Sequence, residues 1–122
     1  MQSNSIPVNQ LLDFQGQVVL VTGAGGGLGS AIARRFAQAG ARVAVHYHNS
    51  RDAAYALVDD LAEAGTDSAA FTADLRQPEA VADLFAQVYA RFGRLDALVN
   101  NAGTYPVTPL METTHQEWDA VM

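Results

Sequence analysis

Gln17-Val-Val-Leu-Val-Thr22, followed by Gly23-Ala-Gly-Gly-Gly-Leu-Gly29, is the stretch that decides the fold. Its first half is a short continuous apolar run, which is typical of a β-strand buried on both faces of a sheet. The glycine cluster leads into Leu28–Ala39, where apolar residues recur at helical spacing until Gly40 ends the pattern. The stretch therefore predicts a buried strand, a tight glycine turn and a helix.

The glycine turn is a candidate phosphate-binding site. Glycine lets the backbone approach a ligand because it has no Cβ, and the free N–H groups at a helix start attract a pyrophosphate. The pattern T-G-x-x-x-G-x-G fits, whereas G-x-G-x-x-G fails because Leu28 takes its sixth position, and a P-loop fails because the chain has no lysine. A purely structural turn is the alternative interpretation. The residues of this turn expected to line the cofactor are Thr22, Gly23, Gly25, Gly26, Gly27, Leu28 and Gly29.

The rest of the chain repeats the same alternation. Further strands are predicted at Arg42–Tyr47, Ser68–Thr72 and Leu95–Val99, with helices at Asp52–Ala64 and Pro78–Phe92 between them. Strands that alternate with helices across short connections indicate βαβ units on a parallel sheet. We therefore predict an α/β fold, a Rossmann-like doubly wound parallel sheet that is incomplete, with about four strands, three full helices and the start of a fourth.

The domain prediction has two parts. Residues 1–15 are polar and aperiodic and are expected to form a loose leader, and residues 16–122 are expected to form the N-terminal part of a dinucleotide-binding domain. Thr104–Leu110 reads as a proline-containing loop, and Thr114-x-x-Glu117 is a capping box that opens the last helix.

Three further motifs stand in order behind the glycine turn. Asp74-Leu75 follows the third strand, Asn100-Asn-Ala-Gly103 ends the fourth, and Trp118-Asp119 lies early in the next helix. With Thr22, Gly23, Gly27 and Gly29, they make the sequence resemble the short-chain dehydrogenase/reductase family from about Phe14 to the end.

The resemblance implies roles for these motifs. The acidic residue after the third strand would contact the adenine, and the N-N-A-G motif would close the cofactor site and steady the sheet. The cofactor-binding residues that these motifs imply are Asp74, Leu75, Asn100, Asn101, Ala102 and Gly103.

The tip of the second strand bears on the choice of dinucleotide. An NAD-selective fold usually carries a carboxylate about 20 residues past the glycines. In this chain the first carboxylate after the glycines is that of Asp52. Arg51 is the strongest donor for a 2′-phosphate, and the H-Y-H-x-S string resembles NADP-dependent members such as pteridine reductases. Against this, Gly26 stands where many NADP-dependent relatives carry a base, and His46 and His48 could simply alternate across a strand end. We expect NADP(H) rather than NAD(H), held in part by Tyr47, His48, Asn49, Ser50 and Arg51.

The resemblance implies hydride transfer between a carbonyl and an alcohol, with a tyrosine as general acid/base whose pKa is lowered by a lysine four residues on. Without lysine, none of the four tyrosines can fit Tyr-x-x-x-Lys, so no catalytic residue is assigned. We predict the cofactor-binding portion of a short-chain oxidoreductase, similar to 3-oxoacyl-carrier-protein or pteridine reductases, that is inactive by itself. The alternatives are a stand-alone dinucleotide-binding or half-enzyme partner module, and a nonfunctional fragment. Strand order in the family would leave Leu95–Val99 as an unpaired edge, which invites aggregation.

Composition excludes several other classes of function. The 122 residues include 13 acidic and 7 basic side chains, a net charge of −6, which argues against a nucleic-acid or membrane-surface partner. Without cysteine there is no disulfide or thiolate site, and no His/Asp/Glu cluster has metal spacing. Without a signal sequence or a long apolar run, a cytoplasmic protein is expected. The resemblance implies a small carbonyl or alcohol substrate and a homo-oligomer for the full-length parent.

Overall fold

The computed structural model describes residues 13–101 and 108–109. A parallel sheet forms the centre of the molecule, with the strand order β3-β2-β1-β4 and a short fifth strand beyond β4. The parallel strands are β1 (Val18–Val21), β2 (Arg42–Tyr47), β3 (Ser68–Thr72) and β4 (Ala97–Val99). The helices that connect them are α2 (Gly27–Gln38), α3 (Arg51–Glu63) and α4 (Pro78–Phe92). The strands and helices predicted up to Val99 are thus confirmed, with ends that differ by one or two residues. The helix expected to open at Thr114 lies outside the described residues.

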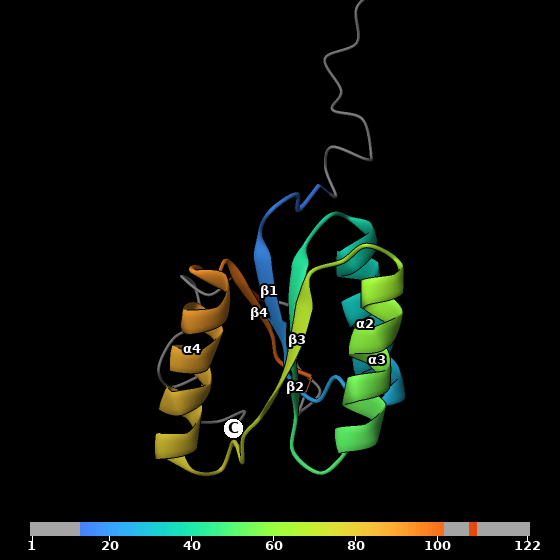
Figure 1. Ribbon diagram of the computed structural model, residues 1–122. Helices are drawn as coiled ribbons and strands as arrows, with labels where there is room; N and C mark the ends of the chain where they lie inside the picture. The colour runs from blue at the N-terminus through green and yellow to red at the C-terminus, as the bar shows by residue number, and fades with distance from the viewer. Residues whose placement is uncertain (1–12, 102–107, 110–122) are drawn as a thin grey trace, which may run out of the picture.

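Helices cover both faces of the sheet, as a doubly wound fold requires (Figure 1). Alternate side chains of β1 point to opposite faces: Val19 and Val21 join the core under α2 and α3, whereas Val18 and Leu20 join the core with Leu84 and other α4 residues. All four β1 side chains are fully buried. The continuous apolar run was therefore a correct signal for a central strand buried on both faces.

The expected unpaired edge at the fourth strand is wrong. β5 (Thr108–Pro109) pairs antiparallel with β4, and the register places Ala97 opposite Pro109 and Leu98 opposite Thr108. β5 lies inside the segment that the sequence suggested was only a loop. A proline is tolerated there because β5 is the outermost strand of the sheet among the described residues, and an edge strand can lack an N–H on its outer side.

The segment just before β1 packs against the end of α2. The Phe14 ring lies edge-on against Phe36, with centroids 5.0 Å apart, and the Phe14 N–H donates to the carbonyl of Ala39 at 2.8 Å. Residues 1–12 of the predicted leader lie outside the described residues, so its boundary stays a prediction. Over the part of the chain that the structure describes, no helix is both long enough and apolar enough to cross a membrane.

Candidate functional site

The candidate site lies where the parallel strands end, because parallel strands deliver all their carboxyl ends to one edge of the sheet. The segments that meet there are the glycine turn after β1, the turn from β2 into α3, the segment after β3 and the end of β4. Thr22, His46 and Asn100 are the buried polar side chains among the described residues, and all three belong to this edge. The predicted residues that are far apart in sequence are therefore neighbours in space.

Two glycines of the turn are required by close packing within the protein. A Cβ on Gly29 would overlap the carbonyl oxygen of Gly23 and lie 2.8 Å from both Ala24 Cα and Asn101 Nδ2. A Cβ on Gly25 would lie 2.7 Å from Ser50 Cβ. These positions let α2, β4 and the β2–α3 turn approach the glycine turn closely.

Gly26 and Gly27 are different, because a Cβ on either meets little or nothing among the described residues. The closest atom to a Gly27 Cβ lies beyond 4 Å, and a Gly26 Cβ would lie an ordinary 3.7 Å from the Gly23 oxygen. Neither glycine has a positive φ. Gly26 caps α2 without a side-chain hydrogen bond to the helix start, and Leu28 in the first turn is 68% exposed. Within the described part of the chain, the start of α2 is thus left open. A side chain at Gly26 or Gly27 would not clash with a described residue.

Hydrogen bonds connect the glycine turn to the end of β4. The Thr22 hydroxyl donates to Asn100 Oδ1 at 3.1 Å and accepts from the Asn101 N–H at 2.9 Å. The Asn101 side-chain amide donates to the Gly23 carbonyl at 3.3 Å. The structure therefore brings these two motifs together and gives both asparagines a role inside the protein. Ala102 and Gly103 lie outside the described residues, as do Trp118 and Asp119.

His46 is the residue of this edge that sequence reasoning did not assign to the site. Its Nδ1 accepts a hydrogen bond from the Gly23 N–H at 3.0 Å, and its Nε2 lies 2.9 Å from the Ala73 carbonyl oxygen. A ring nitrogen that accepts is unprotonated, so these partners select the neutral imidazole with its proton on Nε2. A polar side chain inside the buried run of β2 was the signal that could have found it.

The environment of His46 favours the same neutral form. Burial lowers the pKa of His46, the hydrogen bond to the Ala73 backbone opposes this effect, and the charge of His48 reinforces it. The neutral imidazole therefore connects the glycine turn to the end of β3 through its two hydrogen bonds.

The β2–α3 turn presents polar side chains beside the glycine turn. His48, Asn49 and Ser50 are exposed, and α3 begins directly after Ser50. The Arg51 guanidinium carbon lies 5.0 Å from the centroid of the Tyr55 ring. Arg51, at the start of α3, therefore forms a cation–π contact with the face of the Tyr55 ring.

The two tyrosines next to Arg51 influence each other. Tyr47 is buried and its ring centroid lies 5.9 Å from that of Tyr55. Hydrogen bonding to Tyr47, and then to Arg51, lowers the pKa of Tyr55, whereas burial raises the pKa of Tyr47. Tyr47 is thus mainly a buried packing residue next to Tyr55 and Arg51.

Asp74 lies after β3 and is already paired. Arg76 donates to it from Nε and from one terminal nitrogen, both at 3.0 Å, and also from its backbone N–H at 3.1 Å. These bonds lower the pKa of Asp74 to about 2. His48 Nε2 lies 4.0 Å from the same carboxylate. Leu75 is partly buried against the α4 side of the core.

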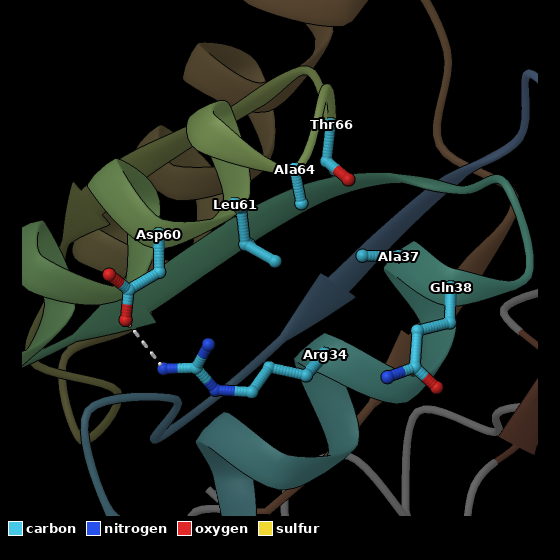
Figure 2. A pocket seen from close by; sticks show the side chains of 7 residues that line it. All are labelled: Arg34, Ala37, Gln38, Asp60, Leu61, Ala64 and Thr66. Atoms are coloured by element: carbon cyan, nitrogen blue, oxygen red, sulfur yellow. Dashed lines mark hydrogen bonds and ion pairs between the residues drawn. The ribbon is translucent and has the colours of Figure 1, made fainter.

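A cavity of about 320 Å³ lies elsewhere, between the C-terminal halves of α2 and α3 (Figure 2). Arg34 and Asp60 face each other across it at 2.9 Å, and none of the predicted cofactor residues lines it. In residues 13–101, no group of three His, Asp or Glu side chains is placed to hold a metal ion.

Comparison with known proteins identifies relatives of the whole arrangement. A family model described as short chain dehydrogenase matches residues 17–122. The chain is similar to versicolorin reductase 1 from Aspergillus parasiticus, with 44% identity over 113 residues that cover 93% of this chain and 42% of the relative.

Solved structures show the same similarity. A dehydrogenase/reductase from Sinorhizobium meliloti matches with a TM-score of 0.75 and 38% identity, over 93% of this chain and 45% of that one. A short chain dehydrogenase from Burkholderia cenocepacia, in complex with NADP, matches with a TM-score of 0.71 and 41% identity, over 88% of this chain and 44% of that one. The chain thus spans less than half the length of the proteins it resembles.

Proposed function

Because the chain belongs to the short-chain dehydrogenase family, we propose that it is the cofactor-binding N-terminal portion of an NADP(H)-dependent oxidoreductase that interconverts carbonyls and alcohols. The observation that carries the proposal is the pair Gly26 and Gly27. The absence of a side chain at these two positions avoids no clash among the described residues, and neither residue has the positive φ that would favour glycine. They stand at an uncapped helix start, which is where a pyrophosphate binds in other proteins.

The residues at this edge fit a dinucleotide. The backbone N–H groups of Gly27 and Leu28 would hold the pyrophosphate, with the Leu28 side chain as an exposed apolar contact. Asp74 would contact the adenine after exchanging part of its bonding with Arg76. Asn100, Asn101 and the residues after them would close the site. When bound, the dinucleotide supplies or accepts the hydride, and the chain's own residues bind and orient it.

NADP(H) is favoured over NAD(H) by the β2–α3 turn. From Tyr47 to Arg51 there is no carboxylate to repel a 2′-phosphate, and Asn49, Ser50 and Arg51 can all donate hydrogen bonds. The NADP complex of the Burkholderia relative supports the same preference.

Catalysis and substrate belong to the proposal for the whole protein. Since 122 residues without lysine hold no Tyr-x-x-x-Lys, we propose that catalysis needs residues outside these 122. The similarity to a versicolorin reductase adds a versicolorin-like ketone to the 3-oxoacyl and pteridine substrates considered from sequence. We also propose a cytoplasmic location, and a homo-oligomer for the full-length parent.

Gly27→Ala tests the binding proposal. The added methyl group meets no described atom within 4 Å, so the melting temperature should hold or rise slightly, while NADPH affinity falls about tenfold or more. Fluorescence titration with NADPH and a thermal melt measure the two effects. Gln38→Ala, at the opposite end of α2, is the matched control and should change neither. Unchanged affinity in Gly27→Ala would contradict the proposed site.

Arg51→Ala tests the cofactor preference. Losing a charge-assisted hydrogen bond should weaken NADPH binding about tenfold and leave NADH binding within about twofold. Arg34→Ala, an arginine beside the α2–α3 cavity, is the control. Equal losses for both dinucleotides would contradict a 2′-phosphate contact.

The second candidate function is a binding module without catalysis, which the glycine turn proposed for the pyrophosphate also favours. Reading the native transcript past the codon for Met122 separates the two. An open frame with an asparagine, then a serine and a Tyr-x-x-x-Lys supports the oxidoreductase. A stop codon directly after Met122 supports the module.

A further inference from the structure

His46 connects two parts of the candidate site that the sequence keeps 50 residues apart, from Gly23 to Ala73. The imidazole is 2% exposed and spans from the Gly23 N–H, 3.0 Å away, to the Ala73 carbonyl, 2.9 Å away. Gly23 opens the turn proposed for the pyrophosphate, and Ala73 immediately precedes Asp74, which is proposed for the adenine. One buried side chain therefore sets the spacing between the two ends of the proposed site.

Gly23 needs such support because of its own backbone. It has a φ of +64°, in the left-handed region, and its carbonyl accepts from the Asn101 side chain while its N–H donates to His46. The Ala24 N–H next to it donates to the His46 carbonyl at 3.0 Å. His46 thus holds the turn through both its side chain and its backbone.

We propose that His46 is a positioning residue for dinucleotide binding, whose neutral imidazole holds the glycine turn and the adenine-side segment at the correct distance. The inference rests on the proposed function, and it assigns His46 no contact with the cofactor. Its two hydrogen bonds require one ring nitrogen to accept and the other to donate. A second proton on the ring would place an N–H of His46 against the N–H of Gly23 and break that contact.

Protonation of His46 therefore couples to binding. A bound dinucleotide holds the Gly23 N–H toward Nδ1, so the complex resists protonation of the ring more strongly than the free chain does. By linkage, affinity is full above the ordinary histidine pKa of 6.5 and falls as the pH drops through the lowered pKa of His46 in the free chain.

The charged groups around His46 define the controls. His48 lies two residues along the chain from His46, Asp74 and Arg76 follow Ala73, and Glu79 lies in the first turn of α4, and none of these four is buried. The glycine turn and β1 contain no charged side chain. His48 is therefore the second imidazole for which the test needs a control.

The test is the pH dependence of dinucleotide affinity in the 122-residue chain. NADH is titrated beside NADPH from pH 8 to pH 5, because it lacks the 2′-phosphate, a group that itself titrates near pH 6. For the wild-type chain we expect NADH affinity to be constant above pH 6.5 and to fall progressively below it, with a loss of about tenfold once the ring is fully protonated, the effect of losing one buried hydrogen bond. Circular dichroism at each pH checks that the chain stays folded.

Two substitutions assign the acid effect. His46→Asn keeps an oxygen that can accept from the Gly23 N–H and cannot take up a proton, so the pH profile should become flat. His48→Asn separates the second imidazole and is judged by the shape of its NADH profile alone: the acid loss should remain and begin at a higher pH, because the His48 charge no longer lowers the pKa of His46. His46→Gln can reach Ala73 but not Gly23, so it should weaken binding about tenfold already at pH 8.

The outcomes separate the proposed function from the role of His46. No dinucleotide binding by the wild-type chain at pH 8 would overturn the proposed function, and this inference with it. Binding at pH 8 with an acid loss that persists in His46→Asn, or that disappears in His48→Asn, would overturn the inference alone. Nitrogen NMR of the wild-type imidazole needs no variant to fold: it should show the proton on Nε2 at pH 8, and a proton on Nδ1 would overturn the inference.

Discussion

The two edges of the sheet are held together in different ways. At the carboxyl edge, buried polar groups form bonds between distant segments: Thr22 with Asn100 and Asn101, and His46 with Gly23. At the amino edge, Phe14 packs against Phe36, and the polar bonds involve more exposed groups: the partly buried Asp96 carboxylate pairs with the exposed Arg94 at 2.6 Å and accepts from the Val18 N–H.

The glycines at the two edges differ as well. Gly93 ends α4 at a φ of +79°, where its N–H donates to the Tyr89 carbonyl, and a Cβ there would meet nothing. Gly29 has no positive φ, and its hydrogen is needed for space. Gly93 thus turns the chain at the amino edge, whereas Gly29 lets segments approach closely enough to build a site at the carboxyl edge. Substitutions at the carboxyl edge should therefore propagate between segments, whereas those at the amino edge should stay local.

Gly29→Ala should have the largest effect. Its methyl group would overlap backbone atoms of Gly23 and Ala24, which cannot rotate away as a side chain can. We expect a loss of about 3 kcal/mol in the free energy of unfolding, measured by urea denaturation. Gly27→Ala is the control in the same turn and should cost little. Equal stability of the two variants would remove the distinction between packed and open glycines.

Thr22→Val should come next. It keeps the shape of a fully buried side chain but leaves the Asn101 N–H and the Asn100 side chain without the hydroxyl. The expected loss is about 2 kcal/mol, with weaker NADPH binding because the turn moves. Thr22→Ser retains the hydroxyl and should recover most of the binding. A Val variant that binds normally would show that the link to β4 does not position the turn.

Asp96→Asn tests the amino edge and should cost about 1 kcal/mol at pH 7. The carboxylate accepts from Arg94 and from the Val18 N–H. Burial raises the pKa of Asp96, but Arg94 and the Val18 N–H outweigh it, so the net pKa lies below the ordinary value of 3.8. A lowered carboxyl pKa stabilises the fold above that value and ceases to do so as the pH falls through the folded pKa. Urea midpoints of wild type and variant should therefore converge toward pH 2, and NADPH affinity at pH 7 should be unchanged.

Arg34→Ala should have the smallest effect. Its ion pair with Asp60 is about half exposed on both sides, so its loss should cost at most about 0.5 kcal/mol. NADPH affinity should not change, because the α2–α3 cavity is not part of the proposed site. A large drop in NADPH affinity would contradict the placement of the binding site at the glycine turn.

Much of the fold was predictable because its signals are local. The apolar run of β1 and the stripe of α4 that ends at Gly93 each reflect the burial pattern of one element. The glycine turn was found in the same way. β5 was missed because two residues carry no periodicity, and its pairing with β4 is a contact between strands.

The sequence predicted the residues of the candidate site better than the hydrogen bonds and ion pairs between them. Spacing pointed to Thr22, Asp74 and Asn101, but it gave no sign that Arg76 occupies the Asp74 carboxylate or that Thr22 and Asn101 bond to each other. His46 was interpreted as part of the H-Y-H-x-S string or of a strand-end alternation, and its bonds were missed because its partners lie 23 and 27 residues away.

The sequence by itself determined the order of strands and helices, the glycine turn between β1 and α2, and the family. Those properties depend on side-chain periodicity, on the absence of a Cβ and on motif spacing, all of which are written along the chain. Only the tertiary structure decided that Gly25 and Gly29 are packed while Gly26 and Gly27 are open, and that His46 joins the turn to Ala73. The reason is physical: crowding and buried hydrogen bonds depend on which atoms meet when parallel strands bring their ends together, and that meeting has no local signature.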